Sequence, residues 1–142
     1  MASQPFVVKS DHIDPGVSLQ LYSDRVLHMV IDDGVVLDLE SVRTARQRIA
    51  GFVNGPYIGV GDLRQVPYIE RDARAELALD NDGRVVATAA ITGRDGPIPL
   101  LVKLWVEGHD IARPVAVFED VPEALAWAHE TALTLRNEGR LP

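Results

Sequence analysis

The first strongly patterned segment of the chain is residues 17–22, where aliphatic side chains alternate with polar or aromatic ones. This period of two predicts a strand with one buried face. A second apolar run, residues 26–31, predicts another strand, and the short turn at Ser23 and Asp24 can join the two as an antiparallel hairpin. The domain is therefore expected to begin at Val17.

Residues 1–16 contain two prolines and several polar side chains, and we expect them to form an N-terminal tail. The remaining domain, residues 17–138, has no repeat, low-complexity stretch or internal linker, and its length suits one hydrophobic core. Segments with helical and strand-like patterns alternate through it. They predict helices over residues 39–53, 68–79 and 121–137, and strands at 57–60, 85–91 and 114–118.

Strands that alternate with helices after an opening hairpin predict a single α/β domain. We expect one mixed, mostly parallel sheet of about five strands with about four helices, the parallel strands being joined by helical crossovers. The segment Leu100 to Val106 is ambiguous in this scheme, because it is apolar at every position except Lys103. A short apolar run fits a buried strand as well as a helix.

Composition excludes several classes of function. The 142 residues include no cysteine, which removes disulfides, thiolate metal sites and cysteine nucleophiles and suits a reducing compartment. With 14 Lys and Arg against 21 Asp and Glu the net charge is −7, and no basic stripe offsets it as a nucleic-acid binder requires. No apolar run is long enough to cross a membrane, and no signal segment is recognised. We expect a cytoplasmic protein that neither binds nucleic acid nor inserts into a membrane.

Four phrases of the sequence carry a family resemblance. Residues 60–64 (VGDLR) lead to residues 69–74 (IERDAR), and residues 114–118 (PVAVF) lead to residues 123–127 (EALAW). Together they resemble a STAS-like (SpoIIAA-like) domain, the fold of bacterial anti-sigma-factor antagonists. The resemblance covers nearly the whole domain. It implies a regulatory role and implies that Leu100 to Val106 is a short helix.

The sequence departs from this family at its regulatory site. In the antagonists, a kinase phosphorylates a serine at the start of the helix that follows the central strand. Here Glu70, Arg71 and Asp72 stand at that place, and no Ser or Thr occurs between Val60 and Ala87, so the phosphorylation switch cannot operate there. Asp72 could replace a phosphoserine permanently, because a helix N-terminus favours negative charge, but the same dipole effect explains an Asp in a first turn without that role.

Candidate catalytic residues form no recognisable constellation. The four histidines lack the spacing of metal ligands, and no motif for a cofactor or a serine nucleophile is present. His28 is expected to face out of its strand. An enzyme would require Asp62, Arg64, Arg71 and His109 to converge in a cleft, which we do not expect.

A second motif, Gly59-Val60-Gly61, follows a predicted strand but lacks the rest of a phosphate-binding loop. A lone pair of glycines is weak evidence for a nucleotide site. We attribute both glycines to close packing at the end of the strand.

The most informative segment for function is Leu100 to Val106. If it is a helix, it is apolar nearly all round, so something beyond its own sheet must cover part of it. The cover could be Leu135 and other residues of the C-terminal helix, a second subunit or an apolar ligand.

These alternatives give two hypotheses of function. The leading one is a non-enzymatic regulatory or scaffolding module that binds a protein partner and forms a homodimer through this helix. The other is a carrier or sensor of a small apolar ligand such as a lipid, held between the sheet and the helix by Leu101, Leu104 and Trp105. The candidate site residues are Leu100, Leu101, Leu104, Trp105, Arg71 and Asp72.

Overall fold

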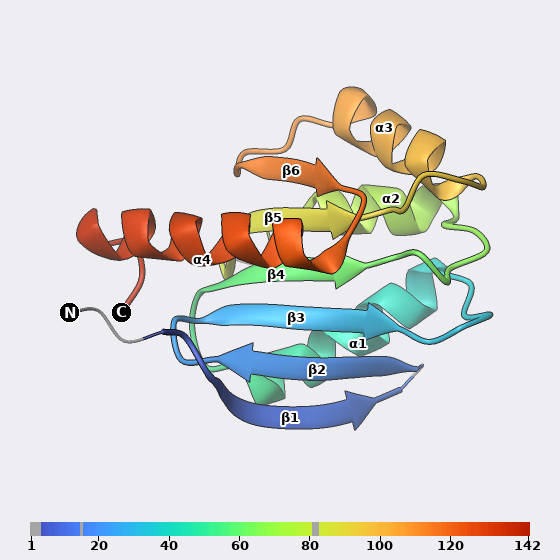
Figure 1. Cartoon of the computed structure of the whole chain (residues 1–142). Helices are drawn as coiled ribbons and strands as arrows, with labels where there is room; N and C mark the ends of the chain where they lie inside the picture. The colour runs from blue at the N-terminus through green and yellow to red at the C-terminus, as the bar shows by residue number, and fades with distance from the viewer. Residues whose placement is uncertain (1–3, 15, 81–82) are drawn as a thin grey trace.

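The computed structural model describes residues 4–14, 16–80 and 83–142, and within these residues it contains one six-stranded sheet and four helices (Figure 1). The strands lie side by side in chain order. The first three are antiparallel, and β3 to β6 are parallel. The strands are β1 (Val7–Ile13), β2 (Val17–Tyr22), β3 (Val26–Ile31), β4 (Tyr57–Asp62), β5 (Val85–Ile91) and β6 (Val115–Phe118), and the helices are α1 (Leu39–Phe52), α2 (Arg71–Ala78), α3 (Ile98–Gly108) and α4 (Val121–Asn137).

The predicted fold class is confirmed. A mixed sheet opens with the β2–β3 hairpin and continues with parallel strands connected through helices. The hairpin turn closes with Arg25 in the left-handed conformation, at a φ of 71°. The segment Leu100 to Val106 lies within α3, so it is a helix, as the family resemblance implied.

The N-terminal strand β1 differs from the sequence prediction, which placed it in a tail. It pairs antiparallel with β2 and forms one edge of the sheet, so the sheet has six strands instead of about five. Six of its seven residues are exposed and only Ile13 is buried. A strand without a buried face has no alternating pattern, and for that reason it was not recognised. Residues 1–3 and Pro15 lie outside the described residues.

Local signals set the ends of the other elements. The Asp38 carboxylate accepts a hydrogen bond from the Ser41 backbone N–H (2.7 Å) and so caps α1. Helix α2 begins three residues later than predicted. The backbone around Ile69 forms a bridge with Leu37 instead, which holds residues 68–70 in an extended conformation. Asn81 and Asp82, expected to end this helix, lie outside the described residues.

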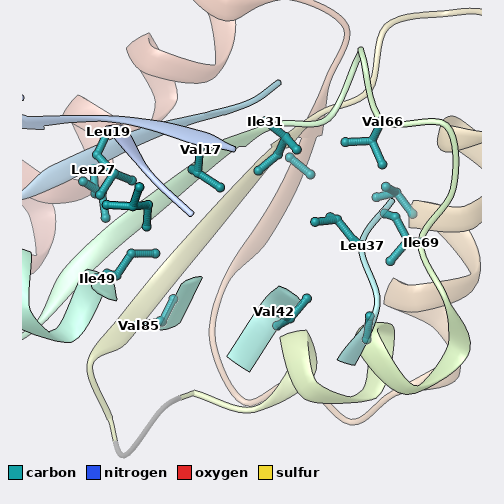
Figure 2. Close-up of a cluster of buried hydrophobic side chains, with 14 of the residues drawn as sticks. Val17, Leu19, Leu27, Ile31, Leu37, Val42, Ile49, Val66, Ile69 and Val85 are labelled. Atoms are coloured by element: carbon teal, nitrogen blue, oxygen red, sulfur yellow. The ribbon is translucent and has the colours of Figure 1, made fainter. Parts of the chain in front are cut away.

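The sheet separates two hydrophobic layers. Helix α4 covers one face, where its alanines and Leu135 pack on β3, β4 and β5. Helices α1, α2 and α3 cover the other face, and Figure 2 shows Leu19 and Leu27 together at one side of that core and Leu37 and Ile69 at another. The expectation that Leu135 covers α3 is wrong, because the sheet lies between them.

Candidate functional site

A cavity of about 150 Å³ lies between the sheet and helices α1, α2 and α3. Its floor comes from the central strands, including Met29 of β3 and Ala90 of β5. Its roof comes from apolar residues of the three helices, among them Val42 of α1 and Val102 of α3. Most of the lining is aliphatic, so the space suits an apolar occupant.

The cavity depends on two glycines of β4. Gly59 and Gly61 both lie on its floor, while Ile58 and Val60, which alternate with them, face α4. A Cβ added to Gly59 would come within 3.1 Å of Met29 Cε, so this glycine does serve close packing. A Cβ added to Gly61 would meet no heavy atom within 4 Å. Our attribution of Gly61 to close packing is therefore wrong, because its missing side chain leaves space empty.

Three arginines also line the cavity, and each binds backbone carbonyls. Arg113 donates to the Leu77 carbonyl (2.7 Å), to the Ala78 carbonyl (3.1 Å) and to Thr88 Oγ1 (2.7 Å). Arg46 donates to the carbonyls of Leu79 (2.8 Å) and Leu77 (3.3 Å), and Arg74 donates to that of Ile69 (2.7 Å). Arg46 and Arg113 thus converge at the C-terminal end of α2.

Burial determines the electrostatics at this end of the cavity. It lowers the pKa of Arg46, and it lowers the pKa of Arg113, which the nearby charge of Arg46 lowers further. Tyr57 is 3% exposed, and burial raises the pKa of its hydroxyl against the opposing charges of Arg46, Arg113 and Arg84. Two cationic groups and one neutral hydroxyl therefore lie close together.

Trp105 is the one predicted ligand-binding residue that lines the cavity. It is 8% exposed, and its Nε1 has no hydrogen-bond partner among the residues that the structure describes. Leu101 is buried in the same core but does not line the cavity. Leu100 and Leu104 face solvent on the outer side of α3, with 61% and 49% of their surface exposed. The proposed lining by Leu104 is therefore wrong.

Arg71 and Asp72 lie at the start of α2, and both are exposed. The N-cap residue Glu70 makes no side-chain hydrogen bond to the helix, and Asp72 lies in the first turn, where it complements the helix dipole. Neither residue lines the cavity. The structure thus places these two site residues away from Trp105.

None of the four residues considered for catalysis lines the cavity. Arg64 forms a two-bond ion pair with Asp62 (2.7 and 2.9 Å), and His109 Nδ1 is 3.0 Å from the Trp105 carbonyl oxygen at the end of α3. His28 was expected to face outward but is 9% exposed, and burial lowers its pKa.

Among the described residues, no group of three or more His, Cys, Asp or Glu side chains could hold a metal ion. Within the same residues, no helix combines the length and apolar character needed to cross a bilayer.

Sequence reasoning missed the residues that shape the cavity. Tyr57, Arg46 and Arg113 come from three distant segments, and nothing in their local patterns links them. The available signal was the alternation of Gly59 and Gly61 on one side of a buried strand. Two absent side chains on the same face indicate either a close approach or an empty space.

Comparison with known proteins adds one solved structure. It is the crystal structure of an uncharacterised protein of the DUF3478 family with a SpoIIAA-like fold from Shewanella loihica PV-4. The two chains are 13% identical with a TM-score of 0.49, and the similarity covers 90% of this chain and 98% of that one. No curated protein matches the sequence.

A family model gives a match over most of the chain. The model is described as Domain of unknown function (DUF7793), and it matches residues 20–132 of the 142. The matched region extends from within β2 into α4 and includes every residue that lines the cavity except Val17. The chain belongs to the DUF7793 family.

Proposed function

We propose that this protein binds a compact apolar molecule in the cavity beneath α1, α2 and α3 and acts as its carrier or sensor. The observation that carries the proposal is the cavity of about 150 Å³ with its mainly aliphatic lining. Apolar cavities of roughly this volume stay dry and accept ligands the size of benzene. A long acyl chain is too large, which narrows the expected ligand from a lipid to a molecule of about one ring.

Energetics favour an occupied cavity. An unfilled apolar space costs stability, because the residues that line it lack packing partners on one side. A ligand that restores the missing contacts would offset this cost, so binding should raise the melting temperature.

Toluene is a suitable first probe, with a cavity-filling variant as the comparison. Gly61→Leu places a side chain where no heavy atom lies within 4 Å of the new Cβ. Gly51→Leu is the matched control, because Gly51 is exposed on α1 and also has no neighbour within 4 Å. Toluene should raise the melting temperature and change the Trp105 fluorescence of the native protein and of Gly51→Leu, but not of Gly61→Leu. Equal responses from all three proteins, or none from the native protein, would reject the proposal.

A second candidate function is a non-enzymatic regulatory module that forms a homodimer through α3. The observation in its favour is the exposure of Leu100 and Leu104 on the outer side of that helix. Light scattering should give a dimer mass for the native protein and a monomer mass for the double variant Leu100→Ser, Leu104→Ser. Leu133→Ser is the control, since Leu133 is a comparably exposed leucine on α4. A monomeric native protein at high concentration excludes this role.

A further inference from the structure

The side chains that line the cavity carry positive charge, whereas the net charge of the protein is negative. The chain carries 21 acidic and 14 basic residues, yet among the described residues that line the cavity three are arginines and none is acidic. Such a lining repels cations and attracts anions. The lining therefore suits a ligand that carries a negative charge as well as an apolar part.

Topology places two of these arginines and an aromatic hydroxyl at one end of the cavity. Tyr57 begins β4 and Arg113 lies two residues before the start of β6, so both lie at the amino end of the parallel strands. The Leu77 carbonyl accepts hydrogen bonds from both Arg113 and Arg46, which brings the two guanidinium groups together. Gly61, by contrast, lies near the carboxyl end of β4, where the lining is mainly aliphatic.

Capping of α2 accounts for part of this arrangement. Basic side chains commonly bind the last carbonyls of a helix, and Arg46 and Arg113 do so here. Capping alone leaves two neighbouring cations partly buried, and the nearby counter-charges, Glu76 and Asp80, do not line the cavity. It also leaves the indole N–H of Trp105 without an acceptor among the residues that the structure describes. A ligand with an anionic group would supply both the counter-charge and the acceptor.

We propose that the ligand is a small organic acid, with an apolar body of about one ring and a single carboxylate. Tyr57, Arg46 and Arg113 bind the carboxylate, and the body occupies the space left by Gly61. The indole N–H of Trp105 donates to an oxygen of the ligand. This inference rests on the proposed function, because it assigns chemistry to the same cavity.

Three probes of similar size separate the two proposals: benzoate, its neutral isostere nitrobenzene, and toluene. Hydrogen bonds to charged groups are strong enough that benzoate should bind about tenfold or more tightly than nitrobenzene, as measured by calorimetric titration. If nitrobenzene and toluene bind but benzoate binds equally or more weakly, the acid preference is overturned and the apolar site stands. If none of the three binds, both proposals fail.

Two substitutions test which residues bind the carboxylate of the ligand. Tyr57→Phe removes only a hydroxyl, and Arg46→Gln removes a charge while keeping an amide donor for the α2 carbonyls. Each should weaken benzoate binding about tenfold and weaken nitrobenzene binding much less, because a neutral nitro group is a weaker acceptor than a carboxylate. The control is Arg43→Gln, which removes the same charge from an exposed position of α1 outside the cavity. Unchanged benzoate affinity in Tyr57→Phe and in folded Arg46→Gln, or equal weakening in Arg43→Gln, would overturn the assignment.

Discussion

The two faces of the sheet are covered in different ways. Helix α4 presents Ala124, Ala128 and Ala132 to the strands, and these small side chains let several of its Cα atoms come within 8 Å of β3 to β6. Few Cα atoms of α1, α2 or α3 come that close to a strand. Their larger side chains hold the helices farther away, and the glycines of β4 do not fill the gap. One face is tightly packed, and the other retains a cavity.

The two layers are therefore suited to different roles, the α4 layer to stabilising the fold and the cavity layer to binding a ligand. A tightly packed layer gains dispersion contacts over its whole area and has no room for another molecule. A layer with an internal space loses some of those contacts, but it can recover them from a ligand. The α4 layer should therefore be sensitive to added volume, and the cavity layer should tolerate it.

The largest effect should come from enlarging a side chain in the α4 layer. Ala128 is fully buried, so Ala128→Leu should lower the free energy of unfolding by about 1 to 3 kcal/mol through overpacking. Ala45→Leu makes the same change on α1, where Ala45 lines the cavity, and should cost little or raise stability. Urea denaturation measures both. Equal losses would show that the two layers are packed alike.

A smaller effect concerns His28, which lies on the α4 side of the sheet. Because burial lowers its folded pKa below the ordinary value of 6.5, the unfolded chain binds the proton more readily. Stability from this residue should be complete above about pH 6.5 and should fall as the pH drops from there toward the folded pKa. His28→Gln should lose less stability than the native protein between pH 7.5 and pH 5. Parallel losses in the two proteins would contradict this.

The two layers can also be compared through their helix caps, because an aspartate caps both α1 and α4 in the same way. Asp120 accepts a hydrogen bond from the Glu123 N–H (3.0 Å), as Asp38 does from Ser41. Asp120→Ala and Asp38→Ala should each lower the free energy of unfolding by about 1 kcal/mol. Toluene should restore stability to Asp38→Ala and Asp120→Ala equally, because neither residue lines the cavity. Unequal restoration would indicate that binding depends on one cap.

The smallest effect is expected at Asp72. As an exposed residue in the first turn of α2, it stabilises the helix by about 0.3 to 1 kcal/mol through the dipole. Asp72→Ala should lower the melting temperature slightly and leave toluene binding unchanged, with Asp72→Glu as the control that keeps the charge. If Asp72 replaces a phosphoserine in partner recognition, Asp72→Ala should instead weaken partner capture while the melting temperature is unchanged.

Much of the fold could be predicted from local patterns. The β2–β3 hairpin, α1 with its Asp38 cap and α4 with its Asp120 cap all follow from short-range chemistry. The strand β1 could not be predicted this way, because its exposed residues carry no alternating pattern. The start of α2 was shifted for a related reason, since the bridge between Leu37 and Ile69 joins distant segments.

The candidate site was predicted less well than the fold. Trp105 was identified because α3 is apolar on all sides, but that pattern could not distinguish the buried Leu101 from the exposed Leu104. The helix faces became distinguishable only when α3 was placed on the sheet. The arginines at the cavity gave no signal in a chain with net negative charge.

The sequence by itself determined the class of fold, the caps and turns, and the absence of cysteine chemistry, because each depends on neighbouring residues or on composition. Only the tertiary structure decided where the helices lie relative to the sheet. That separation sets the cavity volume, leaves the space beside Gly61 empty and brings Arg46, Tyr57 and Arg113 together. Distances between elements arise from the packing of many side chains at once, and no local pattern in the chain encodes them.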